Sequence, residues 1–131
     1  MILKILLALA GVMGAGGMVL AAAAAHVAPG SGVDSAAYML LFHAVAIIGG
    51  AALVQHGTLW RPLALLVLAA WALGAGLFSS DIAMQAFAGH RLFPFAAPTG
   101  GTILIAAWLT FAGTGFVRCC EGLTRPECSG P

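Results

Sequence analysis

Residues 11–26 read GVMGAGGMVLAAAAAH and form the far half of a first hydrophobic segment, residues 2–27. Glycine and alanine have so little side-chain volume that neighbouring membrane helices approach closely where these residues gather. Gly17, Ala21 and Ala25 recur at every fourth position, which places them on one stripe of a helix. We therefore predict that this segment is the central contact helix of a bundle, approached by the second and fourth helices.

The composition of the whole chain is that of a membrane protein. Of its 131 residues, 62% are hydrophobic and only 7% are charged, whereas about a quarter of the residues of a soluble domain are charged. Each crossing of a bilayer takes about 20 residues, so the chain has room for about four crossings. We predict an all-α, integral membrane four-helix bundle that forms one transmembrane domain over the whole chain. The expected spans are residues 2–27, 36–55, 62–85 and 99–117, followed by a tail at residues 118–131.

Turn and cap residues separate these spans. Asp34 or Ser35 is expected to cap the second helix by accepting a hydrogen bond from one of its free N–H groups. Trp60 and Arg61 suit the membrane interface, and Pro62 suits the first turn of the third helix. The connections are therefore expected to be short and to lie at the two membrane surfaces.

The distribution of cations predicts the orientation of the bundle. The cations on the side shared by the N-terminus, the second connection and the C-terminus are Lys4, Arg61, Arg118 and Arg125. Arg91 lies on the opposite side. The positive-inside rule then places both termini in the cytoplasm. The formal net charge of +1, with no basic patch, gives no reason to expect a nucleic-acid partner.

Ionisable side chains inside or near the spans are the first functional candidates. His43 lies about two turns into the second helix, where it needs a polar partner or a wet cavity. The alternative for His43 is a neutral imidazole hydrogen-bonded within the bundle. Asp81 lies either at the interface or deeper, where it would be protonated or paired with His43 or Arg91. Residues expected toward the external face complete a candidate polar site, which consists of His26, His43, Asp81 and His90.

Three cysteines, Cys119, Cys120 and Cys128, lie together in the expected tail. An odd number of cysteines with no histidine beside them does not match a zinc ligand set. We expect free thiols, with palmitoylation of the Cys119-Cys120 pair as a chemically feasible alternative. No metal ion and no cofactor are expected.

Several short motifs, taken in their order and spacing, resemble a known family. These motifs are Ala25-His26, Phe42-His43, Leu77-Phe78-Ser79, Pro98-x-Gly100-Gly101 and Trp108. Through them, residues 14–117 resemble the domain-of-unknown-function 423 family, the YgdD-like small membrane proteins. The resemblance implies a compact bundle of four transmembrane helices in a bacterial inner membrane, or in another internal membrane in eukaryotic relatives. It implies no catalytic residues, because the family has no established reaction.

We expect a structural or accessory subunit rather than an enzyme. The sequence contains neither a Gly-x-Ser-x-Gly elbow nor a His-Glu-x-x-His helix. The expected partners are the lipid bilayer and either further copies of the chain or other subunits of a larger complex, such as a respiratory or other energy-converting one. The residues expected at helix contacts are Gly17, Ala21, Ala25, Gly74, Gly100 and Gly101.

Two alternatives place chemistry on the ionisable residues. A transport component for a small solute or a proton would use His43 and Asp81 as a relay. A haem-binding protein would use His26 and His43 as axial ligands. The second alternative is weakened because His43 lies about 12 Å deeper than the start of its helix, whereas His26 lies at the end of the first helix.

Overall fold

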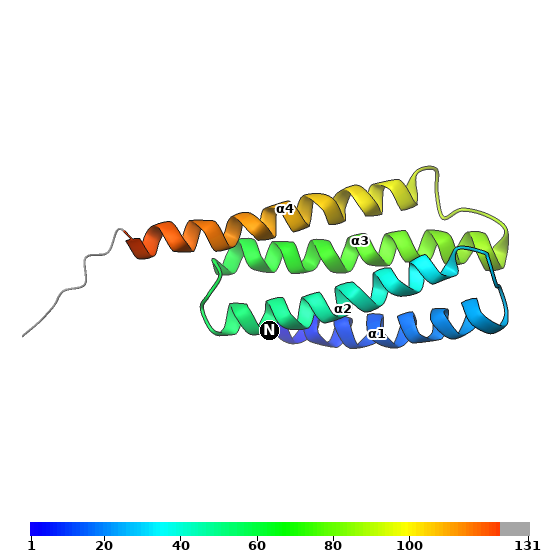
Figure 1. Ribbon diagram of the computed structural model, residues 1–131, viewed down its shortest axis with the longest axis horizontal. Coiled ribbons are helices and arrows are strands. Elements are labelled where there is room, and N and C mark those ends of the chain that lie inside the picture. Colours follow the sequence, from blue (N-terminus) through cyan, green and yellow to red (C-terminus); the bar gives the residue numbers. More distant parts are fainter. Residues whose placement is uncertain (124–131) are drawn as a thin grey trace, which may run out of the picture.

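The computed structural model describes the backbone of residues 1–123 and the side chains of residues 1–114. It consists of four helices that run up and down in turn: α1 (Ile2–His26), α2 (Val33–Gln55), α3 (Arg61–Ala88) and α4 (Ala96–Leu123) (Figure 1). All four contain a segment long and apolar enough to cross a membrane. The prediction of an all-α bundle with four candidate membrane spans is therefore confirmed.

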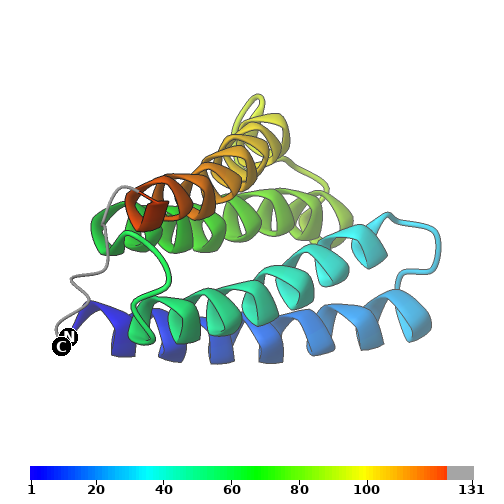
Figure 2. The same ribbon diagram turned by 60° about the vertical axis from the view of Figure 1, so that its left-hand side comes forward.

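The helix at the centre of the bundle is α3. It packs against α1, α2 and α4, whereas α1 packs mainly against α2. Both views show the helices following one another in chain order from α1 to α4 (Figures 1 and 2). Within the described part of the chain, the backbone of α4 lies close to that of α3 and to no other helix. The prediction that α1 is the central helix and contacts the fourth helix is wrong.

The physical reason is the position of the large core side chains. Of the 18 most apolar consecutive residues, 44% are buried in α2 and in α3, compared with 22% in α1 and in α4. The largest fully buried apolar side chains lie on α2 and α3 and include Ile47, Leu68 and Trp71. The small residues of α1 let one neighbour, α2, come close, but they supply little volume around which further helices could assemble.

The contact between α1 and α2 is tightest at Gly17. A Cβ atom added there would lie 2.8 Å from Cγ of Leu41 and 3.1 Å from the carbonyl oxygen of Ala37. Farther along the predicted stripe, Ala21 is half-buried and Ala25 is exposed, while Ala24 is buried. The buried face of α1 therefore continues from Gly17 to Ala24 rather than along the predicted stripe to Ala25.

The contact between α3 and α4 is a second close approach of two backbones. A Cβ atom on Gly74 would lie 3.0 Å from the carbonyl oxygen of Gly100, and one on Gly100 would lie 2.8 Å from the carbonyl oxygen of Gly74. Gly101, the other small residue expected at a contact, has no heavy atom within 4 Å of its Cβ position. Gly100 therefore faces α3, and Gly101 faces open space.

Some helix ends differ from the predicted ones. α2 begins at Val33 because Gly32, at φ 80°, provides the left-handed conformation that precedes it. Asp34 and Ser35 lie inside its first turn, and no side-chain cap bond forms at this end. The predicted capping role is therefore wrong, whereas Pro62 does occupy the first turn of α3.

The fourth helix is longer than predicted at both ends. It begins at Ala96, directly after Phe95, whose φ of 72° is unusual for a residue with a side chain. The carbonyl oxygen of Phe95 accepts hydrogen bonds from the backbone N–H of Thr99 at 2.9 Å and from its hydroxyl at 2.8 Å. At the other end α4 continues to Leu123, beyond the predicted start of the tail at residue 118. The side chains of the three cysteines, and with them the prediction of free thiols, lie outside the described residues.

Candidate functional site: the His43 cluster

His43 lies in the middle of α2 with 5% of its surface exposed. Its Nδ1 atom is 2.8 Å from the carbonyl oxygen of Met39, one turn earlier in the same helix. A carbonyl oxygen only accepts hydrogen bonds, so Nδ1 must carry the proton in this contact. In the neutral imidazole, Nε2 then presents a lone pair away from α2.

Trp108 of α4 uses that lone pair. Its Nε1–H donates a hydrogen bond to Nε2 of His43 at 3.2 Å. The bond joins two helices that do not pack against each other directly, because α4 rests on α3. Both nitrogen atoms of His43 therefore have partners within the bundle, and neither is free to bind a haem iron while these bonds hold.

Two further aromatic rings complete the His43 cluster, which we define as His43, Trp71, Trp108 and Phe111. The ring centroid of Trp71 lies 4.4 Å from that of Trp108 and 5.0 Å from that of Phe111. His43 meets both indoles edge-on, at 6.4 Å from Trp71 and 6.2 Å from Trp108. The cluster thus brings α2, α3 and α4 together at one level of the bundle.

Trp71 carries an unsatisfied polar group within this cluster. Its side chain is 1% exposed. Its Nε1 atom is buried and has no hydrogen-bond partner among the described residues. A buried donor left without an acceptor costs about 1–3 kcal/mol. Such a group in a folded protein calls for a physical explanation.

Asp81 is buried near the end of α3, with 1% of its surface exposed. Its Oδ1 accepts a hydrogen bond of 2.9 Å from the backbone N–H of Leu92, which lies in the loop between α3 and α4. Its observed partner is thus a backbone amide, rather than the side chain of His43 or Arg91. This hydrogen bond ties the loop that leads into α4 to the side chain of Asp81.

Ser79, two residues before Asp81, connects α3 to α2. Its hydroxyl donates a hydrogen bond of 2.8 Å to the carbonyl oxygen of Ala36. This bond places Ser79 level with Ala36, and His43 lies seven residues farther along α2, which corresponds to about 10 Å along the helix axis. Asp81 and His43 are therefore at different depths in the bundle.

The two remaining predicted site residues lie at the surface. His26 is the exposed last residue of α1, and His90 is exposed just beyond α3, with its Nδ1 3.3 Å from the carbonyl oxygen of Arg91. Among residues 1–114, no hydrogen bond joins any two members of the predicted polar site. The structure instead groups His43 with aromatic residues, whereas His26, Asp81 and His90 lie nearer the end of the bundle at which α2 begins.

Trp71 and Trp108 were not among the predicted site residues. A signal for them is nevertheless present in the sequence, because both lie inside expected spans. An indole N–H in an apolar environment needs a hydrogen-bond acceptor. His43 is an acceptor at a comparable depth.

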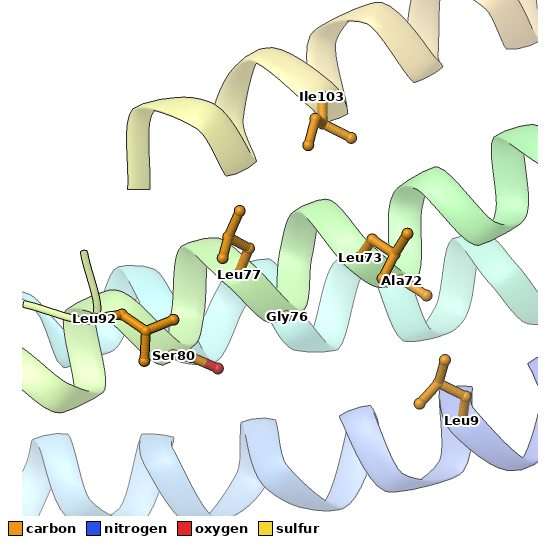
Figure 3. Close-up of a pocket in the computed structure, with 8 residues that line it drawn as sticks. All are labelled: Leu9, Ala72, Leu73, Gly76, Leu77, Ser80, Leu92 and Ile103. Carbon is orange, nitrogen blue, oxygen red and sulfur yellow. The ribbon is translucent and has the colours of Figure 1, made fainter. Parts of the chain in front are cut away.

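Two crevices lined by residues with described side chains border α4. One, of about 380 Å³, lies between α2 and α4, and its lining includes Met39, His43, Gly101 and Trp108. The other, of about 410 Å³, lies between α1, α3 and α4. Figure 3 shows its lining side chains, which come from Leu9 on α1, from several residues of α3 and from Ile103 on α4. Both crevices are almost entirely apolar.

No family model matches the chain, and neither a curated protein nor a solved structure matches it. The resemblance to the domain-of-unknown-function 423 family therefore stays a prediction.

Proposed function

We propose that this protein is a non-enzymatic accessory subunit that binds other membrane-spanning helices through α4, in a bacterial inner-membrane complex. The observation that carries the proposal is the incomplete packing of α4. Within the described residues the backbone of this helix lies close to α3 alone, and a crevice lies on each side of it.

The physical basis is the way in which helices associate in lipid. Lipid tails are as apolar as leucine, so association depends on close packing and on hydrogen bonds between helices. On α4, Ile105 and Leu109 are 63% and 72% exposed, and the Cβ position of Gly101 is open. A partner helix that fills the crevice beside Gly101 would gain the van der Waals contacts that α2 does not supply.

The buried polar side chains support a structural role. Ser79 bonds to the backbone of α2, Asp81 bonds to the loop before α4, and His43 bonds to Met39 and Trp108. Each of these groups joins two parts of the bundle. A relay that uses His43 and Asp81 receives less support, because their hydrogen bonds hold them at different depths.

The proposed orientation has both termini in the cytoplasm. The up-and-down arrangement brings the start of α1 and the far end of α4 to the same end of the bundle (Figure 1). The start of α3, with Arg61, lies at that end as well. Together with Lys4 on α1, this arrangement gives that end the cations that favour the cytoplasmic side.

Native electrophoresis and mass spectrometry after gentle solubilisation of native membranes test the proposal. We expect the wild-type chain to migrate in a larger complex with a second membrane protein. Gly101→Leu should fill the crevice beside α4 and reduce the amount of that complex. The matched control is Gly49→Leu on α2, which also has no heavy atom within 4 Å of its Cβ position and should leave the complex intact.

Three outcomes would count against the proposal. Migration of the wild-type chain alone in every detergent would remove the accessory role. A complex that contains only this chain would replace it with a homo-oligomer. An intact complex in Gly101→Leu would exclude α4 as the docking helix.

A further inference from the structure

The Nε2 atom of His43 has one lone pair, and two indole rings pack edge-on against its imidazole. We propose that this atom is an acceptor shared by Trp108 and Trp71, and that exchange between the two donors forms and breaks the hydrogen bond between α4 and α2. We call this bond from Trp108 to His43 the latch. In the structure described here the latch is closed, because Trp108 Nε1–H holds the acceptor and Trp71 Nε1–H has no partner.

The tautomer of His43 makes the two indoles competitors. The bond from Nδ1 to Met39 fixes the proton on Nδ1, so the ring offers one acceptor atom only. That bond also gives the ring a fixed pivot on α2. A change of partner therefore alters which indole Nε2 faces, while the Met39 bond is retained.

The geometry around His43 is nearly symmetrical. The imidazole centroid is 6.2 Å from the Trp108 ring with an interplanar angle of 63°, and 6.4 Å from the Trp71 ring with an angle of 66°. The two indoles are themselves in contact, at 4.4 Å between centroids. Both indole rings therefore border the imidazole that carries the single acceptor atom.

The two states leave their unpaired donor in different places. In the closed state it is the indole of Trp71, which is 1% exposed. In the exchanged state it is the indole of Trp108, which is 46% exposed and lines the crevice between α2 and α4. Exchange thus gives the fully buried indole N–H of Trp71 an acceptor. It leaves the indole N–H of Trp108 unpaired beside the crevice, where a group from outside the chain can reach it. This difference in surroundings is what makes a two-state element here.

Exchange changes how α4 is held in the bundle. Among the residues with described side chains, the bond from Trp108 to His43 is the hydrogen bond that joins α4 to another helix. Exchange breaks that bond, leaves α4 held by its packing against α3, and opens the crevice beside Gly101. The latch belongs to this chain alone, so it holds or fails whether or not α4 binds a partner.

Nitrogen-15 NMR of the indole groups, with the full chain in lipid nanodiscs, tests the latch. The chain has three tryptophans, so three indole signals are expected. In the wild-type protein, relaxation dispersion should show exchange at the Trp71 and Trp108 signals with one common rate. The signal of Trp60, which lies outside the cluster, should show none.

Two conservative variants then separate the states. Trp71→Phe keeps an aromatic ring but removes the competing donor, so the exchange at Trp108 should disappear. Trp108→Phe frees the acceptor, so the indole proton of Trp71 should shift downfield to a hydrogen-bonded position. Trp60→Phe is the matched control and should change neither signal.

The proposal is overturned if the wild-type Trp71 and Trp108 signals lack a common exchange process. It is also overturned if the Trp71 signal keeps its position in folded Trp108→Phe. The relaxation measurement on the wild-type chain decides the question even if one of the variants does not fold.

Discussion

Gly74 of α3 and Gly100 of α4 meet with their backbones in contact, and each leaves no room for a side chain on the other. A Cβ atom on Gly100 would lie 2.8 Å from the carbonyl oxygen of Gly74 and 2.8 Å from the backbone nitrogen of Phe78. Because α3 is the one helix against which α4 packs in the described chain, this contact sets how closely α4 can approach the rest of the bundle.

We expect Gly100→Ala to destabilise the protein by about 1–3 kcal/mol, because the added methyl group forces two backbones apart. Thermal unfolding in detergent measures the effect. Gly76→Ala is the matched control, since its Cβ position on α3 has no heavy atom within 4 Å. Equal melting temperatures for Gly100→Ala and Gly76→Ala would contradict the close approach.

The contact between α1 and α2 gives a second prediction. Gly17→Leu places a side chain where Leu41 and the backbone of Ala37 already lie. The overpacking should cost about 1–3 kcal/mol, measured as the loss of folded protein in a denaturant titration. Gly11→Leu, on an open part of the same helix, should unfold like the wild-type protein. A stable Gly17→Leu variant would show that α1 and α2 do not meet there.

The carboxylate of Asp81 should act through its acceptor oxygen rather than through its charge. Asp81→Ala leaves the N–H of Leu92 without its partner, at a cost of about 1–3 kcal/mol, whereas Asp81→Asn retains a side-chain oxygen that can accept the bond. Hydrogen exchange at the Leu92 amide should be faster in Asp81→Ala than in Asp81→Asn. Asp34→Ala, at an exposed position, is the control. Equal exchange rates in the two Asp81 variants would show that the side chain of Asp81 does not hold the Leu92 amide.

The hydroxyl of Ser79 should contribute a modest amount to the contact between α3 and α2. Hydrogen bonds between membrane helices average about 0.6 kcal/mol in double-mutant cycles and reach about 1.7 kcal/mol at most. Ser79→Ala should therefore destabilise the protein within that range. The neighbouring substitution Ser80→Ala removes a hydroxyl at an exposed position and should have a smaller effect. A larger loss in Ser80→Ala than in Ser79→Ala would argue against the bond to Ala36.

Local sequence was sufficient for the secondary structure. Four apolar segments of membrane length must become helices in lipid, because a spanning segment has to satisfy its backbone hydrogen bonds internally. The errors at helix ends have local causes as well. α2 begins at Val33 rather than at residue 36 because Gly32 adopts a positive φ, and the first turn of α4 accommodates Pro98 because a proline needs no hydrogen bond at that position.

The sequence by itself thus determined the number and the alternating directions of the helices, since both follow from the apolar runs and from the short connections, whereas the ends of the helices differ from the predicted ones. The tertiary structure decided which faces meet: α3 rather than α1 at the centre, Gly100 rather than Gly101 at a contact, and Trp108 as the partner of His43, 65 residues away in the chain. The physical reason is that residue spacing gives depth along a helix axis, whereas the rotation of a helix and the choice of its neighbours depend on how the side chains of all the helices pack at once.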